Sequence, residues 1–411
     1  MNDHPRQCRK PRPLRAALRA AALTWLAAAS SADRAGGQEK AAVPAAKPAV
    51  IWGLKFSPDG KSLAAATSVS AKEGGTIVVW DVADGRPRLV HFAENGGADV
   101  AFSPDGKLLA FSTWGPRVGI LDVSSDKPVR AWTAHEGKVP ALVFSADGKL
   151  LATAGMDRTI KLWDVATGER KQTLEGHGGA VEGVAFSPDG AMLLSGGMDS
   201  TARLWDLTTG KECRSFQPNQ FIVRRVSFSS DGRFFLTSRW DGRVRIQEAA
   251  SGQLRAVFRG GSQSAALSAD NGLLITSGWG AAHVYRTDLR PLSAEREAEV
   301  RKLIRRWEDD DYQVREAATR EIGLIGLPAE PLLREAMKSP LAEVRLRARR
   351  LRQKIMSPDP SAELTGHAGE VEVVAISPSG DILATGCRGG EVKVWESKTF
   401  REVITLRPPR R

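Results

Sequence analysis

The chain has 411 residues, of which 42% are hydrophobic and 26% are charged. This composition is ordinary for a soluble globular protein and excludes general disorder. The formal net charge of +11 does not by itself indicate a nucleic-acid partner, because residues 1–32 hold six basic side chains against Asp3 alone. A nucleic-acid surface would gather its charge on one face of the folded protein, so we favour a solvated basic surface.

Residues 1–32 are predicted to be a signal peptide. A basic start is followed by an apolar stretch at 20–29 and by the small residues 30–32, in the order that export signals use. The alternative is a disordered tail, since the apolar stretch is rich in alanine. A cleaved leader would place the protein in the periplasm or outside the cell, and an uncleaved one would leave it in the cytoplasm. Residues 33–47 are predicted to be a flexible linker.

One phrase, aromatic-Ser-x-Asp-Gly, recurs along the rest of the chain. Successive copies lie 39 to 46 residues apart, except for one step of 109 residues. A period near 42 indicates a supersecondary unit that must stack against copies of itself to bury its apolar face. The long step leaves room for an inserted module of about 67 residues. The copies begin at Phe56, Phe102, Phe144, Phe186, Phe228, Leu267 and Ile376.

The third unit shows the expected local structure. Short runs rich in β-branched residues, at 138–144, 150–155 and 159–165, are separated by Asp-Gly and Thr-Gly turns. Such runs predict four antiparallel strands per unit. We therefore predict an all-β ring of seven units over 48–292 and 358–411.

Four features recur in fixed order: a Gly-His or Ala-His pair, the FSPDG-type turn, an aspartate after the second strand, and a terminal Trp-Asp. Together they resemble the WD-repeat (WD40) family over about 48–288 and 361–406. The resemblance implies a seven-bladed β-propeller and a buried tetrad of His, Ser/Thr, Asp and Trp within a blade, with a structural role. The tetrad is complete in unit three (His135, Thr153, Asp157, Trp163) and unit four (His177, Ser195, Asp199, Trp205).

The other units depart from this pattern. Unit seven keeps His367, Thr385 and Trp395 but has Gly389 in place of the aspartate. Unit one keeps only Trp80. At the Asp and Trp positions, unit two has Gly115 and Leu121, unit five has Asp241 (with Thr237) and Gln247, and unit six has Gly280 and Arg286.

Residues 293–357 break the β pattern and predict four helices in two hairpins, which resemble a pair of HEAT-type repeats. The predicted helices cover 295–307, a segment capped by Asp309–Asp311 that stops at Gly326, a third opened by Pro328 and Pro331 through Met337, and 341–355, capped by Ser339-Pro340. The module falls between the third strand (281–286) and the fourth strand (361–365) of unit six. Its last helix is basic, and a solvated face is favoured over a nucleic-acid or anionic-surface site.

The resemblance implies that partners dock on the face where the loops between second and third strands emerge. Large side chains occupy that face just before the Asp position or four residues before the repeated phrase. For the tryptophans, filling the space left by missing tetrad residues is an equal alternative. The predicted partner-binding residues are Trp52, Trp114, Met156, Met198, Arg224, Trp240, Trp279 and Arg388.

The sequence has no GxSxG, HExxH or P-loop pattern. We therefore expect no catalytic residue, metal ligand or cofactor, and Cys213 and Cys387 are expected to fill small core positions. The predicted function is a non-enzymatic, monomeric scaffold that binds a protein or peptide. Alternatives are a propeller enzyme with a site in its central depression, and a basic helical arm that binds nucleic acid or an anionic surface.

Overall fold

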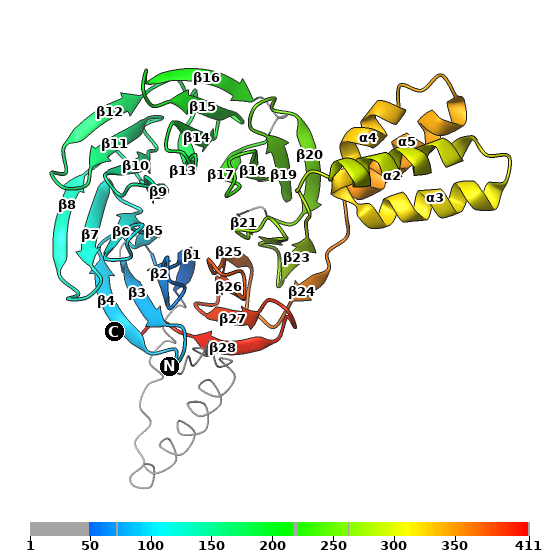
Figure 1. Cartoon of the computed structure of the whole chain (residues 1–411). Coiled ribbons are helices and arrows are strands. Elements are labelled where there is room, and N and C mark those ends of the chain that lie inside the picture. Colours follow the sequence, from blue (N-terminus) through cyan, green and yellow to red (C-terminus); the bar gives the residue numbers. More distant parts are fainter. Residues whose placement is uncertain (1–48, 71–72, 217–220, 262, 410–411) are drawn as a thin grey trace, which may run out of the picture.

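The computed structural model describes residues 49–70, 73–216, 221–261 and 263–409. The predicted signal peptide and linker lie outside the described residues. The described residues form seven four-stranded antiparallel sheets arranged around a central axis, with the strands of each sheet in sequence order (Figure 1). The predicted seven-bladed β-propeller is therefore confirmed.

Each blade is built from four consecutive strands. Blades one to three contain β1 (Val50–Phe56), β2 (Ser62–Ser68), β3 (Gly75–Asp81), β4 (Pro87–Ala93), β5 (Gly97–Phe102), β6 (Leu108–Thr113), β7 (Arg117–Asp122), β8 (Pro128–Thr133), β9 (Ala141–Phe144), β10 (Leu150–Ala154), β11 (Ile160–Asp164) and β12 (Arg170–Leu174).

Blades four to seven follow the same order. They contain β13 (Val181–Phe186), β14 (Met192–Gly197), β15 (Ala202–Asp206), β16 (Lys211–Phe216), β17 (Val223–Phe228), β18 (Phe234–Arg239), β19 (Arg243–Glu248), β20 (Leu254–Arg259), β21 (Ala265–Leu267), β22 (Leu273–Thr276), β23 (Ala282–Arg286), β24 (Ala362–Leu364), β25 (Val371–Ile376), β26 (Ile382–Cys387), β27 (Val392–Glu396) and β28 (Glu402–Leu406).

The recurring phrase forms the turn between the first and second strands. In blade three the Ser145 hydroxyl donates to Asp147 at 2.6 Å and accepts from the backbone N–H of Leu150 at 2.9 Å. Gly148 has φ of 71°, in the left-handed region that glycine adopts without steric cost. The phrase is thus a self-contained turn, which explains why it recurs with so little variation.

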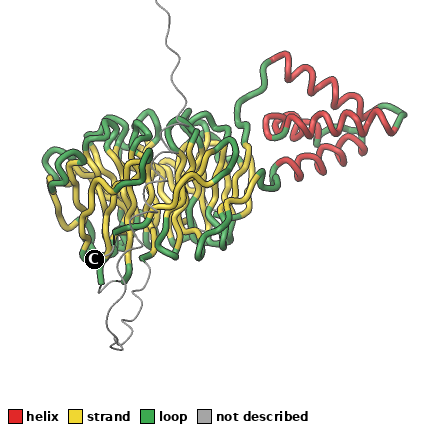
Figure 2. Tube along the Cα trace, turned by 90° about the horizontal axis from the view of Figure 1, so that it is seen from below, coloured by secondary structure: helices red, strands yellow, loops and turns green. Residues whose placement is uncertain are grey.

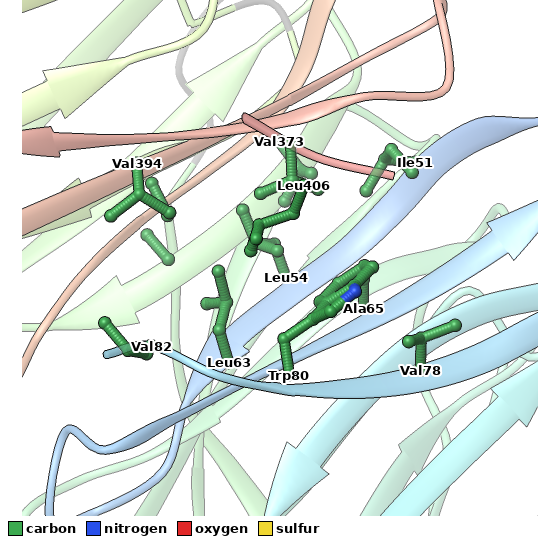
Figure 3. Close-up of a cluster of buried hydrophobic side chains, with 13 residues drawn as sticks. Ile51, Leu54, Leu63, Ala65, Val78, Trp80, Val82, Val373, Val394 and Leu406 are labelled. Atoms are coloured by element: carbon green, nitrogen blue, oxygen red, sulfur yellow. The ribbon is translucent and has the colours of Figure 1, made fainter. Parts of the chain in front are cut away.

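The ring closes by packing between blades one and seven, each of which has its own four strands. Ile51, Leu54 and Trp80 of blade one lie in one buried cluster with Val373 and Val394 of blade seven (Figure 3). Removing apolar surface from water stabilises this seam by about 25 cal/mol for each Å² buried. Within the described residues, apolar contact without an exchanged strand therefore joins the first and the last blade.

The insertion lies within blade six, between β23 and β24, as predicted. It contains α2 (Ala294–Arg305), η1 (Arg306–Glu308), α3 (Tyr312–Ile325), η2 (Leu327–Ala329), α4 (Glu330–Ala336) and α5 (Ala342–Ile355). Asp311 caps α3 by accepting from Gln313 N, as predicted. The predicted cap of the last helix is wrong, because the residue at the N-cap is Leu341, without a side-chain capping bond.

The helical module projects sideways from the rim of the disc (Figures 1 and 2). It packs beside the outer strand of blade five, where Val257 N donates to Met356 O at 2.7 Å. The Glu330 side chain is fully buried between Arg255, at 3.3 Å, and Arg352, at 2.7 Å. These contacts dock the module on β20 of the neighbouring blade.

Cys387 is buried, as expected, but Cys213 is exposed on β16. The expectation that Cys213 fills a core position is therefore wrong, because the first five residues of the outer strand β16, Cys213 among them, are exposed.

Candidate partner-binding face

The predicted tetrads are present in blades three and four. In blade three His135 Nδ1 lies 2.9 Å from Asp157, His135 Nε2 lies 2.8 Å from Thr153 Oγ1, and Trp163 Nε1 donates to the same hydroxyl at 2.9 Å. In blade four the corresponding distances, through His177, Ser195, Asp199 and Trp205, are 2.9, 2.7 and 2.8 Å. Each network joins the second and third strands of its blade to the loop that precedes the first strand of that blade.

Burial and hydrogen bonding set the protonation of blade three's tetrad. Burial lowers the pKa of His135. Burial also acts to raise the pKa of Asp157, but hydrogen bonds from Thr159 and His135 outweigh it and hold that pKa at about 2. The pair therefore carries a stable carboxylate at neutral pH, consistent with a structural role.

The assignment of Arg286 to the Trp position of blade six is wrong. Thr153 pairs with Lys161, eight residues on, whereas Thr276 pairs with His283, seven residues on. The loop between β22 and β23 is thus one residue shorter. Consequently Tyr285 occupies the Trp position, is buried, and donates its hydroxyl to Arg259 O at 2.8 Å.

A bulge in the first strands directs a ring of side chains toward the central axis. Among the described first strands, five have a register irregularity at the residue four positions before the repeated phrase, beginning with Trp52 in blade one. A bulge re-aims the extra residue. The equivalent residues in chain order are Trp52, Ala98, Pro140, Glu182, Arg224, Gln263 and Glu372.

These side chains close the central axis at the face where the loops between the second and third strands of each blade emerge. Six of the seven line a cavity of only about 10 Å³, which is room for about one water molecule. Arg224 lies 3.8 Å from Glu182 and hydrogen-bonds to Gln263. A partner at this face therefore meets the loops and the plugged axis, and no open channel.

A wider cavity of about 510 Å³ lies deeper along the axis, lined by the first strands of blades one to five. Its charged lining residues within the described part of the chain are Lys55, Asp99 and Arg225. Arg225 lies 3.1 Å from Asp99, and burial in the channel lowers the pKa of Lys55. The lining offers neither a histidine nor a cysteine among the described residues, and its carboxylate is already paired.

Four of the eight predicted partner-binding side chains are exposed. Trp279 is 84% exposed, Trp240 58% and Met198 41%. These three lie on consecutive blades, six, five and four. Arg388, in blade seven, has half of its side chain exposed, and its guanidinium contacts Glu372 and lies 3.5 Å from Glu370. Burial raises the pKa of Glu372, an effect that the Arg388 contact opposes.

The other four are half-buried. Trp52 and Trp114 pack edge to face with ring centroids 5.1 Å apart, and Arg224 belongs to the plug described above. Met156 is half-buried in its loop. Trp114 thus packs against a side chain of the neighbouring blade, whereas the exposed Trp279 fills no space in the core.

Sequence analysis missed Phe221, which is 44% exposed. It precedes β17 in the connection from blade four to blade five, and the Arg239 guanidinium lies 5.7 Å from its ring centroid. The sequence signal that could have identified it is an aromatic residue just before the first strand of a blade. That position lies on the same face as the loops between second and third strands. Met198, Phe221, Trp240 and Trp279 are called the apolar arc below.

The basic side chains of the last helix are half engaged within the module and half exposed. Arg347 contacts Glu316 at 2.7 Å and Glu343 at 2.6 Å, and Arg352 contacts Glu330. Arg345 donates to the carbonyl of Ser339. The exposed cations of this helix are Arg349, Arg350 and Lys354. Half of the six basic side chains are therefore engaged inside the protein.

The family model for the WD domain, G-beta repeat, matches residues 42–81, 126–164, 168–206, 210–246 and 358–396. Together with the seven four-stranded blades, these five matches support a β-propeller assembled from WD40 repeats. Proteins of this family typically act as interaction scaffolds for other proteins. A search of the curated proteins finds no match. Among the described helices, none has the length and apolar character needed to cross a membrane.

Proposed function

We propose that the protein is a non-enzymatic scaffold and that its partner is a protein or peptide segment with large apolar side chains, docked on the apolar arc. The observation that carries this proposal is the gathering of exposed Met198, Phe221, Trp240 and Trp279 on three consecutive blades of one face. Aromatic residues dominate the binding energy of protein interfaces, and methionine adapts to the shape of a partner.

Two features support the scaffold over a propeller enzyme. The axial cavity presents a carboxylate that Arg225 already binds. The three histidines that match the family's tetrad positions, His135, His177 and His367, each lie at hydrogen-bond distance from the Ser or Thr hydroxyl of their own blade. General acid–base chemistry needs such groups in reach of a substrate.

Affinity capture from the native host with the full chain tests this proposal. Trp240→Glu and Met198→Glu should each reduce capture of the partner at least about tenfold, as expected when an interface anchor is lost. The matched control is Val129→Glu, the same change at an exposed position of the outer strand β8. Equal capture by all three variants would rule out the arc as the binding surface.

The helical module and the leader complete the proposal. Four helices in two hairpins match the layout of a HEAT-type pair, and we propose that the module is a second, HEAT-like interaction arm on a monomeric scaffold.

We also propose that residues 1–32 direct export and are removed. N-terminal sequencing of the protein from its host tests export, and an intact Met1 would contradict it.

A further inference from the structure

Blade seven departs from the complete tetrads at three positions that all face the same histidine nitrogen. Where blade three has Gly155, Asp157 and Thr159, and blade four has Gly197, Asp199 and Thr201, blade seven has Cys387, Gly389 and Glu391. The aspartate that lies 2.9 Å from His Nδ1 in the other two blades is absent there. Instead, the thiol of Cys387 and the carboxylate of Glu391 lie beside the position of the missing aspartate.

The exchange leaves His367 incompletely bonded. Its Nε2 lies 2.7 Å from Thr385 Oγ1, as in the complete tetrads. Its side chain is fully buried, and its Nδ1 has no hydrogen-bond partner among the described residues. A buried, unpaired polar nitrogen is costly, so this atom calls for a ligand that the protein chain does not supply.

The three new neighbours have the chemistry of metal ligands. His367 Nδ1, Cys387 Sγ and a Glu391 carboxylate oxygen all lie within 4.8 Å of one another, and the His–Glu distance is 3.7 Å. Ligands of a tetrahedral zinc ion lie about 3.5 Å apart, given Zn–N, Zn–O and Zn–S bonds of about 2.0–2.3 Å. Contraction of the widest pair by at most about 1.3 Å would therefore bring all three into bonding distance.

We propose that His367, Cys387 and Glu391 bind one zinc ion in blade seven, with a water molecule as the fourth ligand. Imidazole, thiolate and carboxylate are the zinc ligands of proteins, and three protein ligands plus water is a common coordination. On binding, the thiol proton passes to solvent. The ion takes the position that the aspartate holds in blades three and four, and it joins the loop before β25 to the loop between β26 and β27.

The surroundings suit this assignment. Gly389 N donates to Cys387 Sγ at 3.2 Å, which stabilises a thiolate. With Nδ1 on the metal, His367 Nε2–H donates to Thr385 Oγ1, whose own hydroxyl reaches Lys393 O at 3.4 Å. Glu391 also accepts from Ala368 N at 3.3 Å and lies 3.5 Å from Arg407, contacts that fix its orientation.

Zinc binding by the full chain tests the site. After a chelator has removed its metal and zinc has been added back, the wild-type protein should retain one zinc per chain through gel filtration. Its Tm should then exceed that of the metal-free protein. Cobalt in place of zinc should give a sulfur-to-metal charge-transfer band. Cys387→Ser should weaken zinc binding at least about tenfold and abolish the band, whereas Cys213→Ser, at the exposed cysteine, should behave as wild type.

The matched control is the triple variant Cys387→Gly, Gly389→Asp, Glu391→Thr, which gives blade seven the pattern of blades three and four. This variant should unfold cooperatively, with a Tm at least equal to that of the metal-free wild type, and its Tm should not respond to zinc. The proposal is overturned if the wild type retains no zinc, or if the triple variant retains as much zinc as the wild type.

Discussion

The guanidinium of Arg225, on the first strand of blade five, lies 3.1 Å from the carboxylate of Asp99, on the first strand of blade two. The same guanidinium donates to Pro140 O of blade three at 3.2 Å. One side chain thus joins three blades across the axis. Residues 126 positions apart in sequence become direct partners because the inner strands of all blades face the same axis.

Replacement of Arg225 by Met should therefore lower the free energy of unfolding. We expect a loss of about 2 kcal/mol, since Asp99 keeps its burial and loses a charged hydrogen-bond donor. Urea unfolding of Arg225→Met, Asp99→Asn and the double variant gives the coupling energy. A coupling energy of zero in this cycle would show that the contact does not stabilise the ring.

The buried hydroxyl at the Ser/Thr position should stabilise a blade only where the His and Trp of the tetrad bond to it. Thr153→Val removes the hydroxyl that Trp163 and His135 share, and should cost about 2 kcal/mol because two buried polar groups lose a partner. Thr237→Val is the matched control, because Thr237 Oγ1 of blade five is buried without a hydrogen-bond partner in the described residues. It should leave the unfolding free energy nearly unchanged. Equal effects in thermal or urea unfolding would contradict the structural role of the network.

Acid should weaken blade three through Asp157. The folded-state pKa of about 2 lies below the ordinary value of 3.8. A depressed carboxyl pKa stabilises the folded state above pH 4, and this contribution is lost as pH falls from about 4 to about 2. We expect a loss of about 2 kcal/mol over this window in the wild type, and a correspondingly flatter curve for Asp157→Asn. Parallel stability curves for the two proteins would contradict this account.

The buried Glu330 should hold the helical module on blade five. Glu330→Ala removes one of the two acidic partners of Arg255 and leaves Glu248 as the other. This change should cost about 3 kcal/mol of docking free energy, because a buried pair is broken. Proteinase K should then cleave faster within residues 287–293, the connection between β23 and α2. Glu335→Ala, which removes the exposed partner of Arg301, should have little effect. Equal cleavage rates in both variants would show that the module docks by other contacts.

The repeat spacing predicted the ring and the point of insertion, because every copy carries the same local turn chemistry. The resemblance to WD repeats implied the two complete tetrads. It did not predict which large side chains stay exposed. Trp52 and Trp114 come from different blades, and only the closed ring brings their rings together. Tyr285 was missed because a one-residue difference in loop length shifts the strand register. The cluster at His367 was missed because its members are separated by loops and match no metal-binding motif.

The most direct test of the scaffold proposal is hydrogen exchange of the full chain with and without the captured partner. The account predicts protection in the loops that hold Met198, Trp240 and Trp279 and in the connection at Phe221, with no change in the module around the exposed Leu324. Protection confined to the helical module or to the opposite face of the disc, with the apolar arc unchanged, would contradict it.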